Sequence, residues 1–307
     1  MTSPTPPTPP KIVLGAPLVD LLAKAAPDLP DPVLDGGLLA DEPARAYDAL
    51  RETSVDAQLL VDHCGTLLRH RYGDGYAVIE AEPLLDAGAL DHDGKILTIL
   101  LSWLGTPLRA FDRWPLWKPL GTNLEIEPMR ATGSGYNPLH LDLVNTTLPP
   151  DYSALLCVRP DPRGGGASLT ASLRRAVARL SQDERDLLGQ PVFHDGDFFD
   201  LTGVGEELDP FPVLDELRPE EGFVRFTAKM LPDMDPRDPH TAAARALERE
   251  LIADQGRILL GRGDLLIVNQ HLSAHGRERL GDGQHQLPAE QRRLVWQMFL
   301  RAPGRAA

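Results

Sequence analysis

The sequence has little cysteine and no long hydrophobic run. Its two cysteines, Cys64 and Cys157, form no Cys-x-x-Cys pair, which argues against a disulfide framework and against a cysteine-bound metal. The longest apolar stretch, around residues 96–101, is too short to cross a bilayer. The N-terminus lacks the basic region and the apolar run of a signal peptide. We therefore expect a cytoplasmic protein with no membrane partner.

Positive charge is also scarce, since 31 Lys and Arg residues face 45 Asp and Glu residues and the formal net charge is -14. This balance argues against a nucleic-acid partner, because affinity for a phosphate backbone comes mainly from basic side chains. A phosphate-binding loop is missing as well. The run Gly164–Gly166 has neither the Lys-Ser/Thr pair of an ATP-binding loop nor a dinucleotide pattern, so we interpret it as a flexible turn before a strand.

What remains is an ordinary globular composition, with 42% apolar and 25% charged residues among 307. Residues 1–14 are rich in proline and are predicted to be a disordered tail. Residues 15–307 are predicted to form one domain, with a helical N-terminal scaffold at 15–110 and a β core at 111–301. The scaffold is expected to contain a strand at 76–80 and helices at 18–25, 44–67 and 96–104.

From residue 120 the pattern changes to short apolar segments separated by turn residues. Such spacing is typical of a sandwich or barrel and not of alternating βαβ units. Helical patterns at 170–180 and 241–254 interrupt it. The predicted fold class is therefore mainly β with flanking helices, a decorated jelly roll. The expected strands are 122–128, 139–145, 153–159, 192–199, 223–230, 264–270 and 292–300.

A His-x-Asp pattern occurs in the segment 137–145. If this segment is a strand, its period of two places His140 and Asp142 on one face. An imidazole and a carboxylate aimed at one point are two of the three ligands of a 2-His-1-carboxylate iron site, which leaves positions open for a bidentate 2-oxo acid and O2. A carboxylate at position 142 takes the place a halide would need, which favours C–H oxidation over halogenation.

A second segment supplies candidates for the third ligand. The apolar residues 265–268 are followed by His271 and His275, which would share a face on a strand. An arginine on a later strand can hold a carboxylate through two parallel hydrogen bonds. Arg292 and Arg293 are the candidates, and only one can point at the site because adjacent strand residues face opposite ways. The combination is much more specific than the His-x-Asp pattern alone.

The order and content of these motifs resemble the clavaminate synthase-like branch of the TauD/TfdA-type Fe(II)/2-oxoglutarate-dependent dioxygenases, which includes free amino-acid hydroxylases. The resemblance covers roughly residues 70–300. It is carried by His140-Leu141-Asp142, Pro149-Pro150-Asp151-Tyr152, residues 155–159, residues 164–172, Gly263-Asp264-Leu265-Leu266, His275-Gly276-Arg277 and Arg292-Arg293-Leu294.

The resemblance implies a double-stranded β-helix with iron between its two sheets. It implies that His140, Asp142 and His275 are the metal ligands and catalytic residues. It implies further that 2-oxoglutarate is anchored by Arg293, with Arg292 as the rival, together with Ser168 or Thr170. The chain departs from the family at Ser168, where a threonine is usual, at Asn269-Gln270, where Asp-Asn is usual, and at Gln297, where a second basic residue is usual.

The predicted function is that of an Fe(II)/2-oxoglutarate-dependent oxygenase, which uses O2 to hydroxylate an unactivated carbon of a small polar substrate such as a free amino acid or a derivative. Desaturation, epoxidation or cyclisation of a natural-product intermediate is the alternative with the same cofactors. A non-catalytic, cupin-like metal-binding or ligand-binding jelly roll is the alternative of another class. Specificity is expected from a lid within 194–240. The candidate substrate contacts are Asn123, Glu125, Glu127, Asp195, Asp197 and Asp200.

Overall fold

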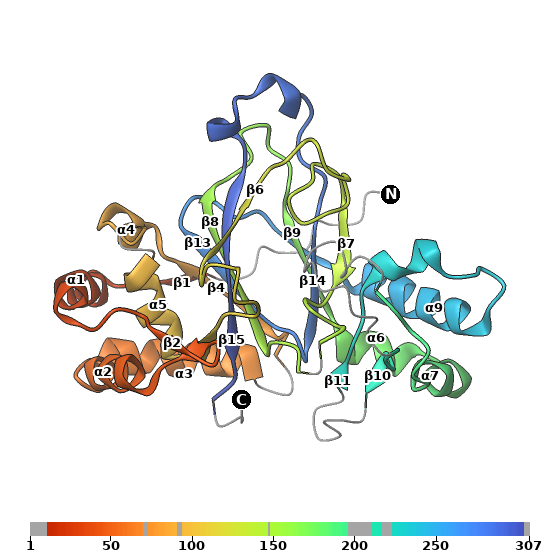
Figure 1. Ribbon diagram of the computed structural model, residues 1–307, viewed down its shortest axis with the longest axis horizontal. Helices are drawn as coiled ribbons and strands as arrows, with labels where there is room; N and C mark the ends of the chain where they lie inside the picture. The colour runs from red at the N-terminus through yellow and green to blue at the C-terminus, as the bar shows by residue number, and fades with distance from the viewer. Residues whose placement is uncertain are drawn as a thin grey trace.

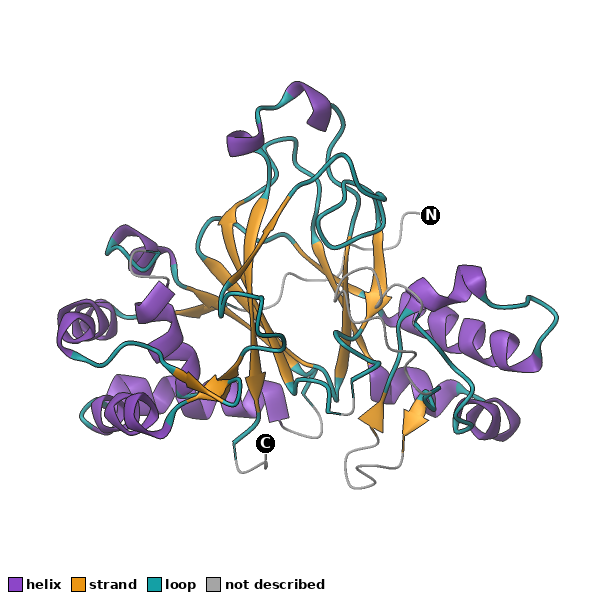
Figure 2. Ribbon diagram, viewed as in Figure 1, coloured by secondary structure: helices purple, strands orange, loops and turns teal. Residues whose placement is uncertain are grey.

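Two β-sheets face each other between two groups of helices (Figure 1, Figure 2). The computed structural model describes residues 11–69, 73–90, 94–146, 148–195, 210–215 and 223–303. In this part of the chain, none of the helices combines the length and the apolar character that a membrane crossing needs. The N-terminal helices cover one sheet and the later helices cover the other, so the space between the sheets is enclosed by strands.

The larger sheet contains nine strands, and residues from both ends of the chain take part in it. Strand β6 pairs with β15 beside the main path. In spatial order the strands are β1 (Ile12–Val13), β4 (Tyr76–Glu80), β13 (Asp264–Asn269), β8 (Tyr152–Arg159), β15 (Leu294–Arg301), β5 (Thr106–Leu108), β3 (Leu38–Leu39) and β2 (Leu34–Asp35), with β6 at Lys118–Gly121.

The smaller sheet has four antiparallel strands and carries the His-x-Asp segment. In spatial order they are β12 (Gly256–Ile258), β9 (Ser168–Ser172), β14 (Ser273–Arg277) and β7 (Asn137–His140). A separate two-stranded hairpin pairs β10 (Leu214–Asp215) with β11 (Phe223–Val224).

The helices form two groups that pack on the outer faces of the two sheets. The first group is α1 (Ala16–Ala25), η1 (Ala26–Asp28), α2 (Asp41–Glu52), α3 (Val55–Arg69), α4 (Glu82–Asp86) and α5 (Lys95–Ser102). The second group is α6 (Leu173–Arg179), α7 (Gln182–Leu188), η3 (Ala228–Asp233) and α9 (Pro239–Asp254). Two further single turns precede β15, namely η4 (Gln284–Gln286) and η5 (Ala289–Gln291).

Strand alternation explains how one sheet serves both a core and a cavity. In β15, Trp296, Met298 and Leu300 pack with the N-terminal helices. Val295 and Gln297, which alternate with them, face the space between the sheets and line a cavity there. Strand β13 is apolar on both faces because both of its faces are covered.

Several sequence predictions need correction, each because a side chain or a turn interrupts the expected element. The helix expected at 44–67 is two helices, because the Ser54 hydroxyl accepts a hydrogen bond from the amide of Ala57 and starts α3. The strand expected at 223–230 stops at 224, and the hydroxyl of Thr227 accepts from the amide of Lys229 at the start of η3. The expected helix at 170–180 begins only at 173, after β9.

The strand expected at 122–128 is a loop. The side chain of Asn123 accepts a hydrogen bond from the amide of Glu125, which is a local turn that competes with strand pairing. Of the segment expected at 192–199, Phe193 forms an isolated bridge with Phe211, and 196–199 lies outside the described residues.

Residues 11–14 do not belong to a disordered tail, although the prediction of a tail at 1–14 included them. Strand β1 pairs in parallel with β4, so residues 12 and 13 belong to the large sheet, and Lys11 binds the Asp264 carboxylate at 2.7 Å. Residues 1–10 lie outside the described part of the chain.

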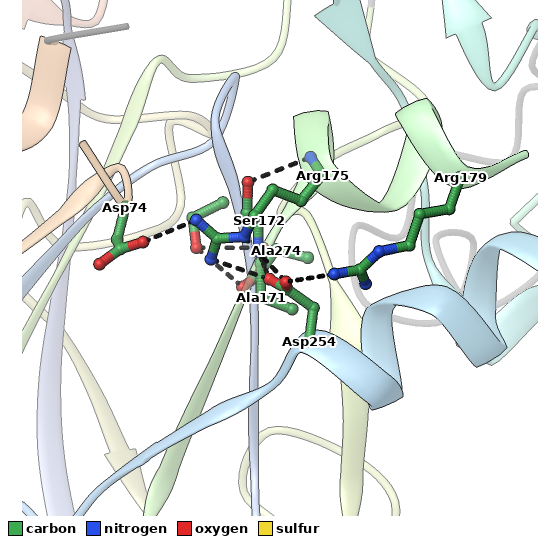
Figure 3. Close-up of polar contacts among 8 residues, drawn as sticks. Asp74, Ala171, Ser172, Arg175, Arg179, Asp254 and Ala274 are labelled. Atoms are coloured by element: carbon green, nitrogen blue, oxygen red, sulfur yellow. Dashed lines mark hydrogen bonds and ion pairs between the residues drawn. The ribbon is translucent and has the colours of Figure 1, made fainter. Parts of the chain in front are cut away.

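A buried carboxylate, Asp254 at the end of α9, ties the helices of the small sheet to the turn before β4 (Figure 3). It accepts hydrogen bonds from Arg175 Nε at 2.8 Å and from the amide of Ser172 at 2.9 Å, and Arg179 lies 3.5 Å away. Arg175 also donates to Asp74 at 2.9 Å. Burial raises the pKa of the Asp254 carboxyl, but the hydrogen bonds from Arg175 and Ser172 outweigh it, and the net pKa is lowered.

We predict that Asp254→Ala lowers the free energy of unfolding by about 1–3 kcal/mol, because it removes hydrogen bonds between charged groups. A depressed pKa stabilises the folded state above the unfolded pKa of about 3.9, and the contribution is lost as the pH falls through the folded value. The stability gap between wild type and variant, measured by urea unfolding, should therefore be full at pH 7 and shrink below about pH 4. Asp235→Ala, which breaks an exposed pair with Arg237, is the control and should leave the midpoint unchanged. A pH-independent gap would contradict the assignment.

Candidate active site

The pairing of β7 with β14 brings the two candidate histidines side by side. His140 is the register partner of His275, and their ring centroids lie 4.5 Å apart. Asp142 does not extend the strand as expected. Strand β7 ends at His140, and Asp142 opens a turn in which Leu143 has a φ of 58°. One ligand atom from each of His140, Asp142 and His275 lies within 4.8 Å of the others, so the structure brings the predicted triad together.

The protonation states of His140 and Asp142 suit metal binding. The Nδ1 atom of His140 lies 2.8 Å from the carbonyl oxygen of Pro138, which directs Nε2 toward Asp142. Burial, together with the charges of Lys229 and His275, lowers the pKa of His140 well below its usual value, so its imidazole is neutral. Burial raises the pKa of Asp142, but the interaction with His275 outweighs it and keeps the carboxyl ionised. Neutral imidazole and carboxylate are the forms that bind a metal.

Two glutamines hold Asp142 in place. The backbone amide of Asp142 donates to the side-chain oxygen of Gln270 at 2.5 Å, and Gln270 donates in turn to the Pro150 carbonyl. Gln297 donates from Nε2 to Asp142 Oδ2 at 3.2 Å and to Ser153 Oγ at 3.1 Å. Two departures from the family pattern, at 270 and 297, thus both contact this one residue.

The cluster lies on the wall of a cavity of about 650 Å³ between the sheets, a size suited to small-molecule ligands. Its lining combines apolar side chains from β8 and β15 with charged side chains from other segments. The lining includes Trp114, Lys118, Leu120, Glu125, Glu127, Arg130, Asn137, His140, Asp142, Leu155, Ser168, Asp195, Thr227, Lys229, His275, Arg277, Arg293, Val295, Gln297 and Phe299.

The structure separates the rival co-substrate anchors that the sequence left open. Arg293 lines the cavity and is half-buried, whereas Arg292 donates from Nε to the carbonyl of Leu287 at 3.0 Å. Burial lowers the pKa of Arg293. Ser168 lines the same cavity, whereas Thr170 lines a smaller one and hydrogen-bonds Tyr76.

Sequence reasoning gave no role to Arg277, which lines the cavity and is 4% exposed. It donates to the carbonyl of Gly135 at 2.6 Å. Burial, and to a lesser extent the charge of Arg293, lowers the pKa of Arg277 to about 10. The sequence could have indicated that Arg277 faces the site, because a strand period of two from His275 puts residue 277 on the same face.

The glycine run lies in a turn before β9, as expected, but two of its three glycines are tightly packed. A Cβ on Gly165 would lie 2.5 Å from the backbone carbon of Leu280, so only glycine allows the two loops to touch. Gly166 has a φ of +72°, and a Cβ there would lie 3.3 Å from Arg293 Cδ. Asp161 fastens the same contact by accepting hydrogen bonds from the amides of Gly165 and Gly281.

Only some of the candidate substrate contacts line the cavity. Glu125 and Glu127 line the cavity from the loop that follows β6, and Asp195 lines it from the other side. Asn123 does not line it. Asp197 and Asp200 lie outside the described residues, as do 196–209 and 216–222 of the expected lid segment.

The other candidate third ligand, His271, lies in the turn between β13 and β14 and does not belong to the cluster of the triad. Its Nε2 atom lies 2.5 Å from Asp151 Oδ1.

A second cavity, of about 760 Å³, lies on the other side of β6 and β15 and is lined by Trp117 and Trp296. The one carboxylate among its lining residues, Asp31, pairs with Lys95. The triad therefore marks the cavity between the sheets as the candidate site.

Comparison with known proteins assigns the family. Residues 121–298, more than half of the chain, match the family described as taurine catabolism dioxygenase TauD, TfdA family. The protein thus belongs to the TauD/TfdA family of dioxygenases, and the family predicted from the motifs is confirmed.

Two relatives match part of the chain. An L-asparagine oxygenase from Streptomyces coelicolor is 31% identical over 42% of this chain and 38% of its own length. An L-lysine 3-hydroxylase from Catenulispora acidiphila is 28% identical over 45% of this chain and 39% of its own length. The chain thus matches about two fifths of the length of each relative.

Solved structures match nearly the whole chain. Asparagine oxygenase in complex with Fe(II), 2S,3S-3-hydroxyasparagine and succinate has a TM-score of 0.73 and 22% identity, over 95% of this chain and 93% of that one. The non-heme iron oxygenase OrfP in complex with Fe and alpha-ketoglutaric acid has a TM-score of 0.68 and 16% identity, over 96% and 94%. The predicted fold class, a mainly β double-stranded β-helix with flanking helices, is confirmed.

We predict that Gly165→Ala destabilises the protein more than Gly164→Ala. Gly164 has a φ of +79° and open space around it, so its alanine variant suffers backbone strain alone, about 1 kcal/mol. An alanine at 165 meets backbone atoms that cannot rotate away, and overpacking of this kind costs about 1–3 kcal/mol, occasionally more. Urea unfolding of both variants measures the difference. Equal midpoints would show that the two loops are not packed as described.

Proposed function

We propose that this protein is an Fe(II)- and 2-oxoglutarate-dependent dioxygenase that hydroxylates a carbon of a free amino acid or a small derivative. The observation that carries the proposal is the convergence of His140, Asp142 and His275 on a cavity that Arg293 also lines. The amino-acid substrate is supported by the relatives named as an L-asparagine oxygenase and an L-lysine 3-hydroxylase, and by neighbours in complex with hydroxylated asparagine and arginine.

The residues present fit ferrous iron. Two imidazoles and one carboxylate are the donor set of non-haem Fe(II) oxygenases, and the cluster opens onto the cavity on its remaining side. When bound there with 2-oxoglutarate, iron supplies the activation of O2 that is coupled to oxidative decarboxylation to succinate and CO2.

The residues of the chain orient the metal ligands, bind the charged co-substrate and line the cavity with apolar surface. Gln270 and Gln297 fix Asp142, so its carboxylate keeps one orientation relative to the two imidazoles. Arg293, with Ser168 beside it in the lining, holds the distal carboxylate of 2-oxoglutarate. Phe299 and Leu155 line the cavity with apolar surface, which keeps water from the reacting carbon.

The first test of the function is a screen of amino acids for iron-dependent release of succinate, with mass spectrometry of the products. Hydroxylation adds one oxygen, and desaturation removes two hydrogens. Asp142→Ala removes the charged ligand and should abolish succinate release. Asp112→Ala, a change at a fully exposed carboxylate, is the control and should retain full activity. Unchanged turnover in Asp142→Ala would remove this residue from the mechanism.

Arg293→Met should raise the KM for 2-oxoglutarate roughly 10- to 150-fold, the effect of losing a charge-assisted hydrogen-bond pair. The matched control is Arg292→Met, one residue away, where the guanidinium bonds the Leu287 carbonyl instead of facing the cavity. Its KM should stay within about twofold of wild type. Initial rates at varied 2-oxoglutarate measure both. If the control variant shows the larger effect, the two arginines have been assigned the wrong way round.

A further inference from the structure

The cavity contains a cation with no anionic partner. Lys118 is half-buried, and no carboxylate of the described residues lies within 4.0 Å of its ammonium group. Its Nζ atom lies 3.3 Å from the ring centroid of Trp114, and Trp114 is braced by an edge-on contact with Phe111 at 4.7 Å. The aromatic face fixes the ammonium in position but does not neutralise it.

Strand register explains why this lysine points into the cavity. In β6, Lys118 and Leu120 alternate with Pro119, which faces the second cavity on the other side of the sheet. Lys118 is the register partner of Gln297 on β15. Lys118 therefore stands opposite a neutral glutamine that hydrogen-bonds Asp142.

Lys118 is also separated along the strands from Arg293, the proposed co-substrate anchor. Arg293 precedes Gln297 by four residues, which is roughly 13 Å along an extended chain. The charge of Asp142 favours the protonated ammonium, whereas burial, the larger effect, lowers the pKa of Lys118 to about 8. A ligand carboxylate would satisfy both the charge and the unused donors.

We propose that Lys118, held against Trp114, pairs with a carboxylate of the substrate and so restricts the substrates to free acids over the corresponding amides and amines. This inference rests on the proposed function, because it takes the cavity to be a substrate site. The carboxylate is the α-carboxylate or a side-chain carboxylate, and the two sources give different binding patterns.

The test is anaerobic calorimetry on protein loaded with Fe(II) and 2-oxoglutarate, with each of the standard L-amino acids and its α-amide as probes. Lys118→Met keeps the length and the apolar contact with Trp114 but removes the charge. Binding of the best amino acid should weaken roughly 10- to 150-fold in this variant and recover in Lys118→Arg, with 2-oxoglutarate affinity unchanged. Weak binding of all α-amides identifies the α-carboxylate, and an effect confined to aspartate and glutamate identifies the side-chain carboxylate.

A second readout separates recognition from a structural role. Because Lys118 has no counter-ion among the residues that the structure describes, Lys118→Met without substrate should keep or raise the melting temperature, and a residue needed for the fold would lower it. Lys24→Met, at an exposed surface lysine, is the control for loss of charge and should change neither property. Amino-acid affinity within twofold of wild type in Lys118→Met, or a parallel loss of 2-oxoglutarate affinity, would overturn the inference. If wild type binds no amino acid, the proposed function fails along with it.

Discussion

The register between β7 and β14 is the constraint on which the site depends. It sets His140 opposite His275, two residues separated by most of the β core in the chain. Antiparallel pairing fixes this alignment to the residue, because a slip by one position would turn every side chain to the other face. Asp142, beyond the end of β7, has no such ladder, and Gln270 and Gln297 hold it by side-chain hydrogen bonds instead. The two histidines are thus positioned by strand pairing, and Asp142 is positioned by side-chain hydrogen bonds.

Much of the β core could be predicted from sequence, because its central strands are long apolar runs. Strands β8, β13 and β15 lie within a residue or two of the expected segments, and α9 begins near its expected start. The errors occur where one polar side chain redirects the backbone, as Ser54 does before α3 and Asn123 does after β6. Hydrophobic periodicity contains no information about such local hydrogen bonds.

The candidate site divides in the same way. The metal triad could be predicted because its residues match a known family pattern, and the structure brings the three residues together. The roles of these residues, the cytoplasmic location and the division into domains stay predictions. The choice between Ser168 and Thr170 could not be made from sequence, because both share a strand face and only the second sheet determines which cavity each reaches. Lys118 was missed because its strand is short and contains proline, so no periodic signal marks it.

Strand β15 is shared by two regions with different demands. Its Trp296, Met298 and Leu300 belong to the helical core, and its alternate side chains Val295 and Gln297 form the cavity wall. Mutations in this strand would therefore be tolerated poorly during evolution, since a gain on one face risks the packing of the other. The loop after β6, which contributes Glu125, Glu127 and Arg130 to the cavity lining, has no part in the helical core. Substitutions that change the substrate range should accordingly occur in that loop, while the three candidate iron ligands stay unchanged.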